Sequence, residues 1–244
     1  MPNPASDSLP AGAREFHTTH WSLVVSAQGD ASGARVALGK LCQSYWYPLY
    51  AFVRRQGVSP HDAQDLTQEF FARLLEKGWL GGVDRQRGRF RSWLLASIKH
   101  FLANEWDRSR AKKRGGGMAQ FSFDELDAES RLAHEPATET AEKIYDRRWA
   151  LTLLDQVMAR LRTEMAGAGK LAHFEALKFC LAGEKHAYAE VAARIAISEG
   201  AVKVAVHRLR ERYRELLRAE IAETVAGPEE IEDELRALLA ALSS

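Results

Sequence analysis

Apolar residues recur at three- and four-residue steps along almost the whole chain, and few runs show the alternation of a strand. This period predicts an all-α protein. A glycine triplet and scattered acids follow the third of the expected helices, a composition typical of a linker. The helices are expected at about 31–56, 60–77, 89–112, 140–165, 170–182, 186–195, 198–222 and 229–242.

The linker divides the chain of 244 residues into two small helical domains, each long enough to bury a core of its own. We expect an N-terminal helical bundle over 21–114, an acidic linker over 115–140, a helix-turn-helix domain over 141–222 and an acidic amphipathic extension over 223–244. The extension has an apolar face. It either packs on the chain's own core or serves as a docking or autoinhibitory element.

The net charge of +1 conceals a separation of charges along the chain. Residues 85–114 hold ten Lys and Arg against two acids, and residues 198–218 hold six against three. Residues 115–142 reverse this with seven acids against one Arg, and the tail from Ala219 does the same. The two basic segments are therefore the ones suited to meet phosphate.

A short helix, a tight turn and a longer helix follow one another from Tyr188, as in a helix-turn-helix, whose second helix enters a major groove. Ala196 stands in the turn, where many such motifs carry Gly. A solvated basic face on a helical hairpin is the alternative. The buried positions expected are Val191, Ala192, Ile195, Ile197, Val202, Ala205 and Leu209. The DNA-binding residues expected are Ser198, Gly200, Lys203, His207, Arg208 and Arg210.

The other basic segment combines an apolar stripe, from Phe90 through Leu94 and Ile98 to Trp106, with side chains that can read base edges or hold phosphates. Phe90 and Trp93 are candidates for stacking on unpaired bases, although aromatics at helical spacing more often belong to a core. The candidate DNA-binding residues here are Arg87, Arg89, Arg91, Lys99, His100, Asn104, Arg108, Arg110, Lys112, Lys113 and Arg114.

The helix expected over 60–77 has an apolar side and an acidic side. Leu66, Phe70 and Leu74 belong to the apolar side. The acidic side would repel the phosphates that the neighbouring helix attracts, so it faces either water or a basic partner protein. Its carboxylates are Asp62, Asp65, Glu69 and Glu76.

Together these segments resemble the extracytoplasmic-function sigma factors of bacterial RNA polymerase. DAQDLTQEFFARLL is similar to the segment that grips the polymerase clamp helices, and GRFRSWLLASIKHFLANEWDRSRAKKR to the segment that reads and melts the minus-ten element. YAEVAARIAISEGAVKVAVHRLRERY resembles the helix-turn-helix that reads the minus-thirty-five element. The resemblance covers about residues 30–218 in the order of the family. It implies a non-enzymatic initiation factor that directs core RNA polymerase to promoter DNA.

The resemblance also implies a polymerase-binding set, formed by Asp62, Gln64, Asp65, Gln68, Glu69 and Arg73. Members commonly carry Glu where Gln64 stands, and Asn and Asp where His100 and Asn104 stand. We expect Thr67 to share or border the acidic side, so a phosphate on it would replace the missing charge. Simple packing of Thr67 at the helix border is the alternative. A Ser/Thr kinase and an anti-sigma protein are thus candidate partners.

Other classes of protein explain less of the chain. No Gly-rich phosphate loop, Ser/His/Asp set or HExxH motif occurs, so we expect no enzyme and no cofactor. Cys42 and Cys180 are unpatterned, which predicts neither a disulfide framework nor a metal site and fits a cytoplasmic setting. No apolar run is long enough for a bilayer, so no membrane partner is expected. A stand-alone helix-turn-helix regulator is the main alternative, and it explains only 186–218.

Overall fold

The computed structural model describes residues 31–74, 89–111, 125–133, 138–181 and 188–243, which form helices and turns without strands. The all-α expectation is confirmed. None of the helices in these ranges combines the length and apolar character needed to cross a bilayer. The helices are α2 (Ala31–Arg55), α3 (Pro60–Leu74), α4 (Phe90–Ala111), α5 (Glu125–Leu132), α6 (Ala141–Gly167), α7 (Leu171–Leu177), α8 (Tyr188–Ile195), α9 (Glu199–Ala222) and α10 (Ile231–Leu242), with 3-10 turns at Lys178–Cys180 and Pro228–Glu230.

Helix α5 lies where no helix was predicted. It is held on α2 by polar contacts: Glu129 accepts hydrogen bonds from Arg54 (Nε–Oε1 2.7 Å) and from the Tyr50 hydroxyl (2.6 Å), and Ala128 beside it is buried. The hydrogen bond from Arg54 lowers the pKa of Glu129. The expectation of an unbroken linker was therefore wrong at these eight residues. A helix held by polar contacts shows no sustained apolar period, which is why the sequence pattern did not predict it.

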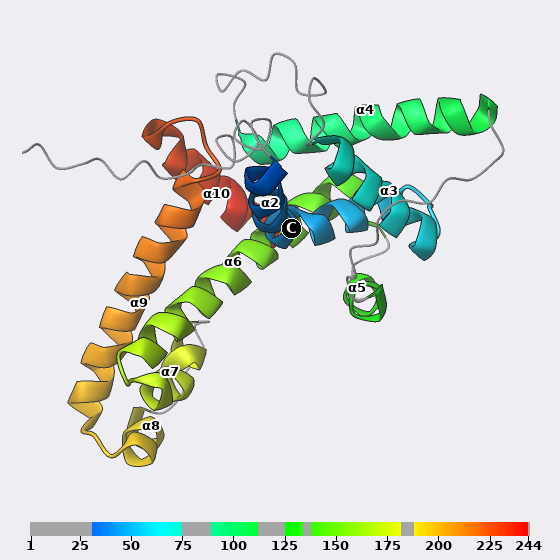
Figure 1. Ribbon diagram of the computed structural model, residues 1–244. Helices are drawn as coiled ribbons and strands as arrows, with labels where there is room; N and C mark the ends of the chain where they lie inside the picture. The colour runs from blue at the N-terminus through cyan, green and yellow to red at the C-terminus, as the bar shows by residue number, and fades with distance from the viewer. Residues whose placement is uncertain (1–30, 75–88, 112–124, 134–137, 182–187, 244) are drawn as a thin grey trace, which may run out of the picture.

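Helix α6 runs through the middle of the molecule and joins two apolar clusters (Figure 1). Thr140 begins it by accepting a hydrogen bond from the backbone N–H of Lys143, and Gly169, at φ +69°, follows its end. Its first half packs on α2 and places Tyr145 and Trp149 in one cluster with α3, α4 and α10. Its second half packs with α7, α8 and α9 in the other. Because α6 belongs to both clusters, the structure does not separate two domains at 115–140. The predicted division there remains a prediction.

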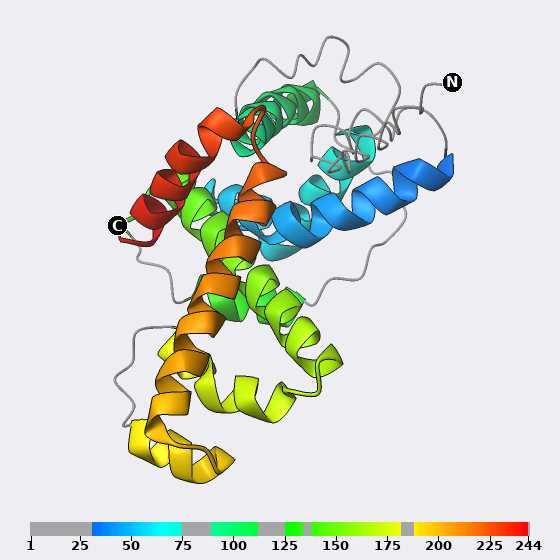
Figure 2. The same ribbon diagram turned by 90° about the vertical axis from the view of Figure 1, so that its left-hand side faces the viewer.

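The C-terminal extension packs on the chain's own core, the first of the two roles considered for it. Helix α10 contacts α6 and α9, and Leu238 is fully buried in the first cluster, with Ile231 and Leu235 packed beside it. Helix α9 packs across α6 and carries the chain back from α8 to α10 (Figure 2). The end of α9 lies against the start of α4, where the backbone N–H of Phe90 donates to the carbonyl of Thr224 (3.1 Å).

The turn between α8 and α9 adopts the geometry that glycine usually supplies. Ala196 has φ +54°, a left-handed conformation that disfavours a side chain with Cβ. The N–H of Ile197 donates to the carbonyl of Ala192 across this turn (3.1 Å), and Ser198 then caps α9 by accepting from the N–H of Ala201 (3.2 Å). The tight turn predicted at this position is therefore present.

Ala196→Gly should stabilise the protein by about 1 kcal/mol, because glycine adopts a positive φ without the strain that Cβ introduces. Thermal or urea unfolding measures this directly. Ala193→Gly is the matched control: Ala193 is exposed inside α8, where glycine costs about 1 kcal/mol of helix stability. A variant Ala196→Gly that unfolds as readily as Ala193→Gly would contradict the account of the turn.

Candidate nucleic-acid interface

The helix-turn-helix forms one end of the molecule, and α4 lies at the other (Figures 1 and 2). Within the helix-turn-helix, the expected core is present. Val191, Ala192, Val202 and Leu209 are buried, and Ile195, Ile197 and Ala205 pack against them. The exposed surface at the start of α9 carries the side chains expected to meet DNA: Ser198, Gly200, Lys203, His207 and Arg208.

Arg210 belongs to the core of this end rather than to its DNA-facing surface. Its guanidinium is half-buried and donates twice to the carbonyl of Cys180, from Nη2 at 2.7 Å and from Nε at 3.3 Å. Arg194 similarly donates to the carbonyl of Ala176 (2.8 Å). These contacts tie the helix-turn-helix to the end of α7, so the expectation that Arg210 faces DNA is corrected.

Val204 is a surface residue that the pattern did not reveal. Its side chain is 50% exposed, one residue after Lys203 and four before Arg208 on the exposed surface of α9. A valine inside an apolar-periodic helix reads as core by type, and only its register against Val202 and Val206, both buried, places it outside. An apolar side chain here suits the methyl group of thymine.

Arg208 also borders a hollow of about 340 Å³ between α6, α7 and α9. Met165, Leu177 and Leu209 contribute its apolar surface, and the basic residues around it are Lys170, His173, Arg208 and Arg212. Arg212 is occupied by Glu164 (Nε–Oε2 2.8 Å), which joins α9 to α6. The surface beside the exposed side of α9 is thus cationic as well.

Helix α4 presents its apolar stripe to the core and a polar surface outward. Phe90, Leu94, Ile98, Phe101 and Leu102 are buried as expected. His100, Asn104 and Arg108 are exposed, and Arg108 pairs with Glu105 (2.7 Å). Lys99 is paired with Glu142 of α6 (2.7 Å), a hydrogen bond that lowers the pKa of the carboxyl. The remaining DNA-binding side chains predicted for this segment lie outside the described part of the structure: Arg87, Arg110, Lys112, Lys113 and Arg114.

The aromatic residues of α4 are placed differently from the expectation. Phe90 is fully buried against Tyr45, with ring centroids 5.3 Å apart, so it cannot stack on a base. Trp93 is half-buried beside it and belongs to the same core. Trp106, expected inside, is 41% exposed and lines a hollow of about 200 Å³ with Lys99. The apolar stripe ends before Trp106, which therefore borders the outward surface of the helix.

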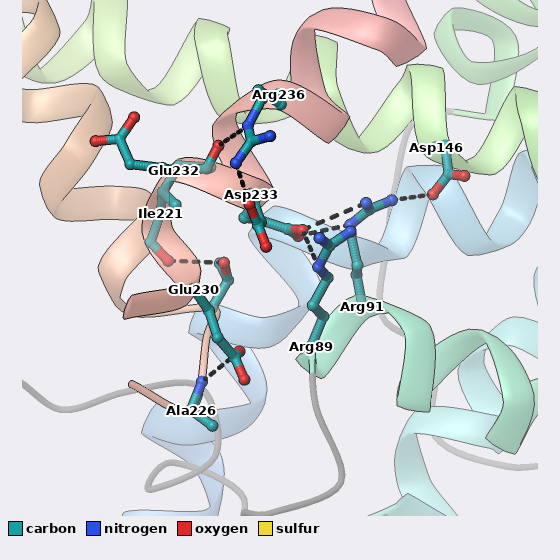
Figure 3. A network of polar contacts seen from close by, with 11 residues as sticks. Arg89, Arg91, Asp146, Ile221, Ala226, Glu230, Glu232, Asp233 and Arg236 are labelled. Atoms are coloured by element: carbon teal, nitrogen blue, oxygen red, sulfur yellow. Dashed lines mark hydrogen bonds and ion pairs between the residues drawn. The ribbon is translucent and has the colours of Figure 1, made fainter. Parts of the chain in front are cut away.

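Arg91 is buried, contrary to its expected role on an open DNA surface (Figure 3). Its Nε donates to Glu234 of α10 (2.6 Å), a second nitrogen pairs with Asp146 of α6, and the guanidinium lies 4.5 Å from the ring centre of Trp149. Arg89, one third exposed, also pairs with Glu234 (2.9 Å). Glu234 has no exposed side-chain surface. The two arginines that precede the outward surface of α4 are therefore occupied by the C-terminal extension.

The charges of this cluster depend on one another. Burial disfavours the cation, but the hydrogen bond and the charge of Glu234 outweigh it and raise the pKa of Arg91. Burial raises the pKa of the Asp146 carboxyl against the pull of Arg91. Separating such a pair leaves a buried charge without its partner, which is the costly way to alter it.

The outward side of α3 carries three of the expected acids, Asp62, Asp65 and Glu69, each in a different state, whereas Glu76 lies outside the described residues. Ser59 caps the start of α3: its hydroxyl accepts from the backbone N–H of Asp62 (3.2 Å) and donates to the Asp62 carboxylate (2.7 Å). Asp65 is 65% exposed and contacts only His61 among the described ion pairs (3.4 Å). Glu69 pairs with Arg73, which also binds Glu105 of α4 (2.8 Å). Gln64 and Gln68 are half-buried between these acids.

Thr67 does not border this acidic side. Its side chain is fully buried, and its hydroxyl donates to the carbonyl of Ala63 (2.7 Å). Thr67 lies four residues after Ala63 and three before Phe70, both buried, so it stands on the apolar stripe of α3. The expectation of an accessible phosphorylation site is wrong, and packing, the alternative considered for Thr67, is what the structure has.

Residues 41–112, which contain α3 and α4, match the family described as Sigma-70 region 2. The match supports a sigma-70 family factor, that is, a non-enzymatic initiation factor that binds core RNA polymerase and takes part in recognising and melting promoters. No solved structure is significantly similar to this chain. Among the described residues, no three His, Cys, Asp or Glu side chains gather as a metal site would require.

Arg210→Ala should destabilise the protein by about 2 kcal/mol, because it removes two charge-assisted hydrogen bonds and leaves the carbonyl of Cys180 without them. Arg208→Ala, two residues earlier and exposed, should change stability by no more than about 0.5 kcal/mol. Urea unfolding compares the two. Equal loss in both variants would mean that Arg210 is not a packing residue.

Proposed function

We propose that this protein is an initiation factor of the extracytoplasmic-function type, which binds core RNA polymerase and directs it to promoters by reading two DNA elements. The observation that carries the proposal is the Sigma-70 region 2 match, because it covers both the acidic side of α3 and the outward surface of α4. The helix-turn-helix lies outside that match and supplies a second surface suited to DNA. One chain thus holds a protein-binding face and two nucleic-acid-binding faces.

In this proposal the three faces have separate roles. Asp65 and the glutamines beside it bind the polymerase clamp helices, with Asp62, Glu69 and Arg73 shaping that side of α3. His100, Asn104 and Arg108 read the minus-ten element on α4. The start of α9 lies in the major groove of the minus-thirty-five element, where Lys203, Val204, His207 and Arg208 meet bases and phosphates.

A stand-alone helix-turn-helix regulator is the competing function. It accounts for α8 and α9, and it leaves the exposed Asp65 and the outward surface of α4 without a role. Run-off transcription with core polymerase separates the two: an initiation factor confers promoter-dependent transcripts on core enzyme, whereas a regulator does not act without another sigma factor.

Asp65→Lys should abolish assembly with core polymerase, because it reverses an exposed carboxylate of α3 where a basic partner surface is expected. Stability should change by no more than about 0.5 kcal/mol at such an exposed position. Co-purification with core polymerase measures assembly. Asp155→Lys, at an exposed carboxylate on α6, is the matched control and should assemble normally. A variant Asp65→Lys that assembles as well as this control would contradict the clamp assignment.

The two DNA faces should fail in different ways. Lys203→Ala and Arg208→Ala should weaken binding to the upstream element, by about 1–3 kcal/mol for any side chain that reads a base. Substitution of His100 or Asn104 should instead change the preferred minus-ten sequence and the extent of melting. Permanganate footprinting of open complexes detects melting, and binding to an upstream duplex detects the first effect. Equal losses of both from both sets would favour a regulator with one DNA surface.

A further inference from the structure

Val204 is an exposed apolar side chain on a basic surface. It is 50% exposed, whereas Val202 and Val206, two residues before and after it, are buried. The other large apolar side chains of the described residues with such exposure lie away from α9: Trp106, Phe179 and Leu239. Valine also favours a helix less than alanine, lysine or glutamate do. Neither packing in the core nor helix formation therefore explains a valine at position 204.

The helical register places Val204 almost opposite the core side of α9. At about 100° per residue, Val204 lies about 160° around the helix from both Val202 and Val206. Arg208 lies about 40° to one side of it, and His207 about 60° to the other side. All three of these outward side chains are exposed. Val204 is thus the centre of the surface that α9 turns outward, with a basic residue on each flank.

The outward surface of α9 is barest just before Val204. Gly200 has no side chain, and outside the neighbouring backbone only the Ser198 hydroxyl (3.9 Å) lies near the position where one would begin. Side chains of a helix lean toward its N-terminus, so the methyl groups of Val204 lie toward this bare turn. Two turns after Val204's own position the surface ends at Glu211, whose carboxylate pairs with His207 (3.2 Å) and would be repelled by phosphate. The turn from Gly200 to Val204 is therefore the part of α9 that can approach a base edge most closely.

A DNA major groove matches this pattern better than a protein surface does. Protein interfaces form on contiguous apolar patches, whereas Val204 is a single apolar side chain between Arg208 and His207. The major groove has base edges on its floor and phosphates along its walls. An apolar centre with basic flanks thus places Val204 over the base edges and the basic side chains beside the phosphates.

A valine side chain distinguishes base pairs in one way only. It has neither a hydrogen-bond donor nor an acceptor, so it cannot read the polar groups of a base edge. The apolar group that the major groove presents is the C5-methyl group of thymine. The same group stands on the same ring carbon of 5-methylcytosine, whereas uracil and cytosine lack it. A contact with Val204 therefore depends on the methyl group and not on the rest of the base.

From these observations we infer that Val204 reads the C5-methyl group of one pyrimidine in the upstream element, so that 5-methylcytosine can take the place of thymine there. This role rests on the proposed function, in which the start of α9 lies in the major groove. Val204 then adds specificity without charge, because it contributes to binding only where a methyl group lies beneath it. Promoter recognition by this protein is consequently sensitive to cytosine methylation at one position.

Selection of promoters locates that position. The complex of the full-length factor with core RNA polymerase selects from a promoter library randomised in the upstream element, and each selected thymine is then replaced by uracil in turn. Competition binding should show a loss of about four-fold at one thymine, which is what burial of a single methyl group contributes. A selected element in which no thymine responds overturns the role of Val204 alone. A complex that selects no upstream sequence overturns the proposed function, and the role of Val204 with it.

Four promoters then separate the methyl group from the base. At the responding position they carry thymine, uracil, 5-methylcytosine or cytosine, each with its matching purine on the other strand. Thymine should bind about four-fold more tightly than uracil, and 5-methylcytosine should exceed cytosine by the same factor. A gain for thymine over uracil without a gain for 5-methylcytosine over cytosine overturns the reading of the methyl group.

Val204→Ala assigns the contact to this residue. It removes both methyl groups of the side chain at an exposed position where alanine favours the helix, so the fold is kept. Both methyl ratios should fall from about four to below about two. Lys203→Ala is the matched control at the neighbouring exposed residue: it should weaken all four promoters by a similar factor and leave both ratios unchanged. Ratios that persist in Val204→Ala would come from the shape of the DNA and would overturn the assignment to Val204.

Discussion

Arg91 keeps a full positive charge almost out of contact with water, and the arrangement of α4, α6 and α10 depends on how that charge is paired. Two other helices supply its partners: Glu234 comes from α10, and both Asp146 and the ring of Trp149 come from α6. A buried guanidinium without these partners would be strongly destabilising. The pairing therefore specifies one position of α10 on the core, where apolar contacts alone would allow several.

The polarity of the extension follows from its place in the fold. Residues from Ala219 onward hold seven acids, which would all be solvated if this segment were a free tail. Folded back, α10 meets the basic start of α4, and α9 meets α10 through Arg218 and Glu232. The near-neutral net charge thus combines basic segments with acidic ones, and the contact of α10 with the start of α4 reduces the long-range attraction of that region for phosphate.

Helix positions and most of the core could be predicted from the sequence, because both follow the 3.6-residue period. What the period could not supply was the state of polar residues that stand on the apolar stripe. Arg91 lies three residues before Leu94, Glu234 three after Ile231, and Thr67 four after Ala63. All three are buried. Their register on the apolar stripe was the available signal, but a charged or polar residue type argues against burial. Arg91 and Glu234 are also partners that lie 143 positions apart in the chain, so neither predicts the other.

Helix α9 connects the two ends of the molecule. Its first turn is capped by Ser198 and exposed, while its last residues lead to the Thr224 carbonyl that accepts from α4. Between them Arg212 pairs with Glu164 and Arg160 with Glu220, so ion pairs as well as the core join the middle of α9 to one turn of α6. A continuous helix of 24 residues is stiff over this distance. Its packing on α6 therefore fixes the orientation of the helix-turn-helix relative to the rest of the described chain.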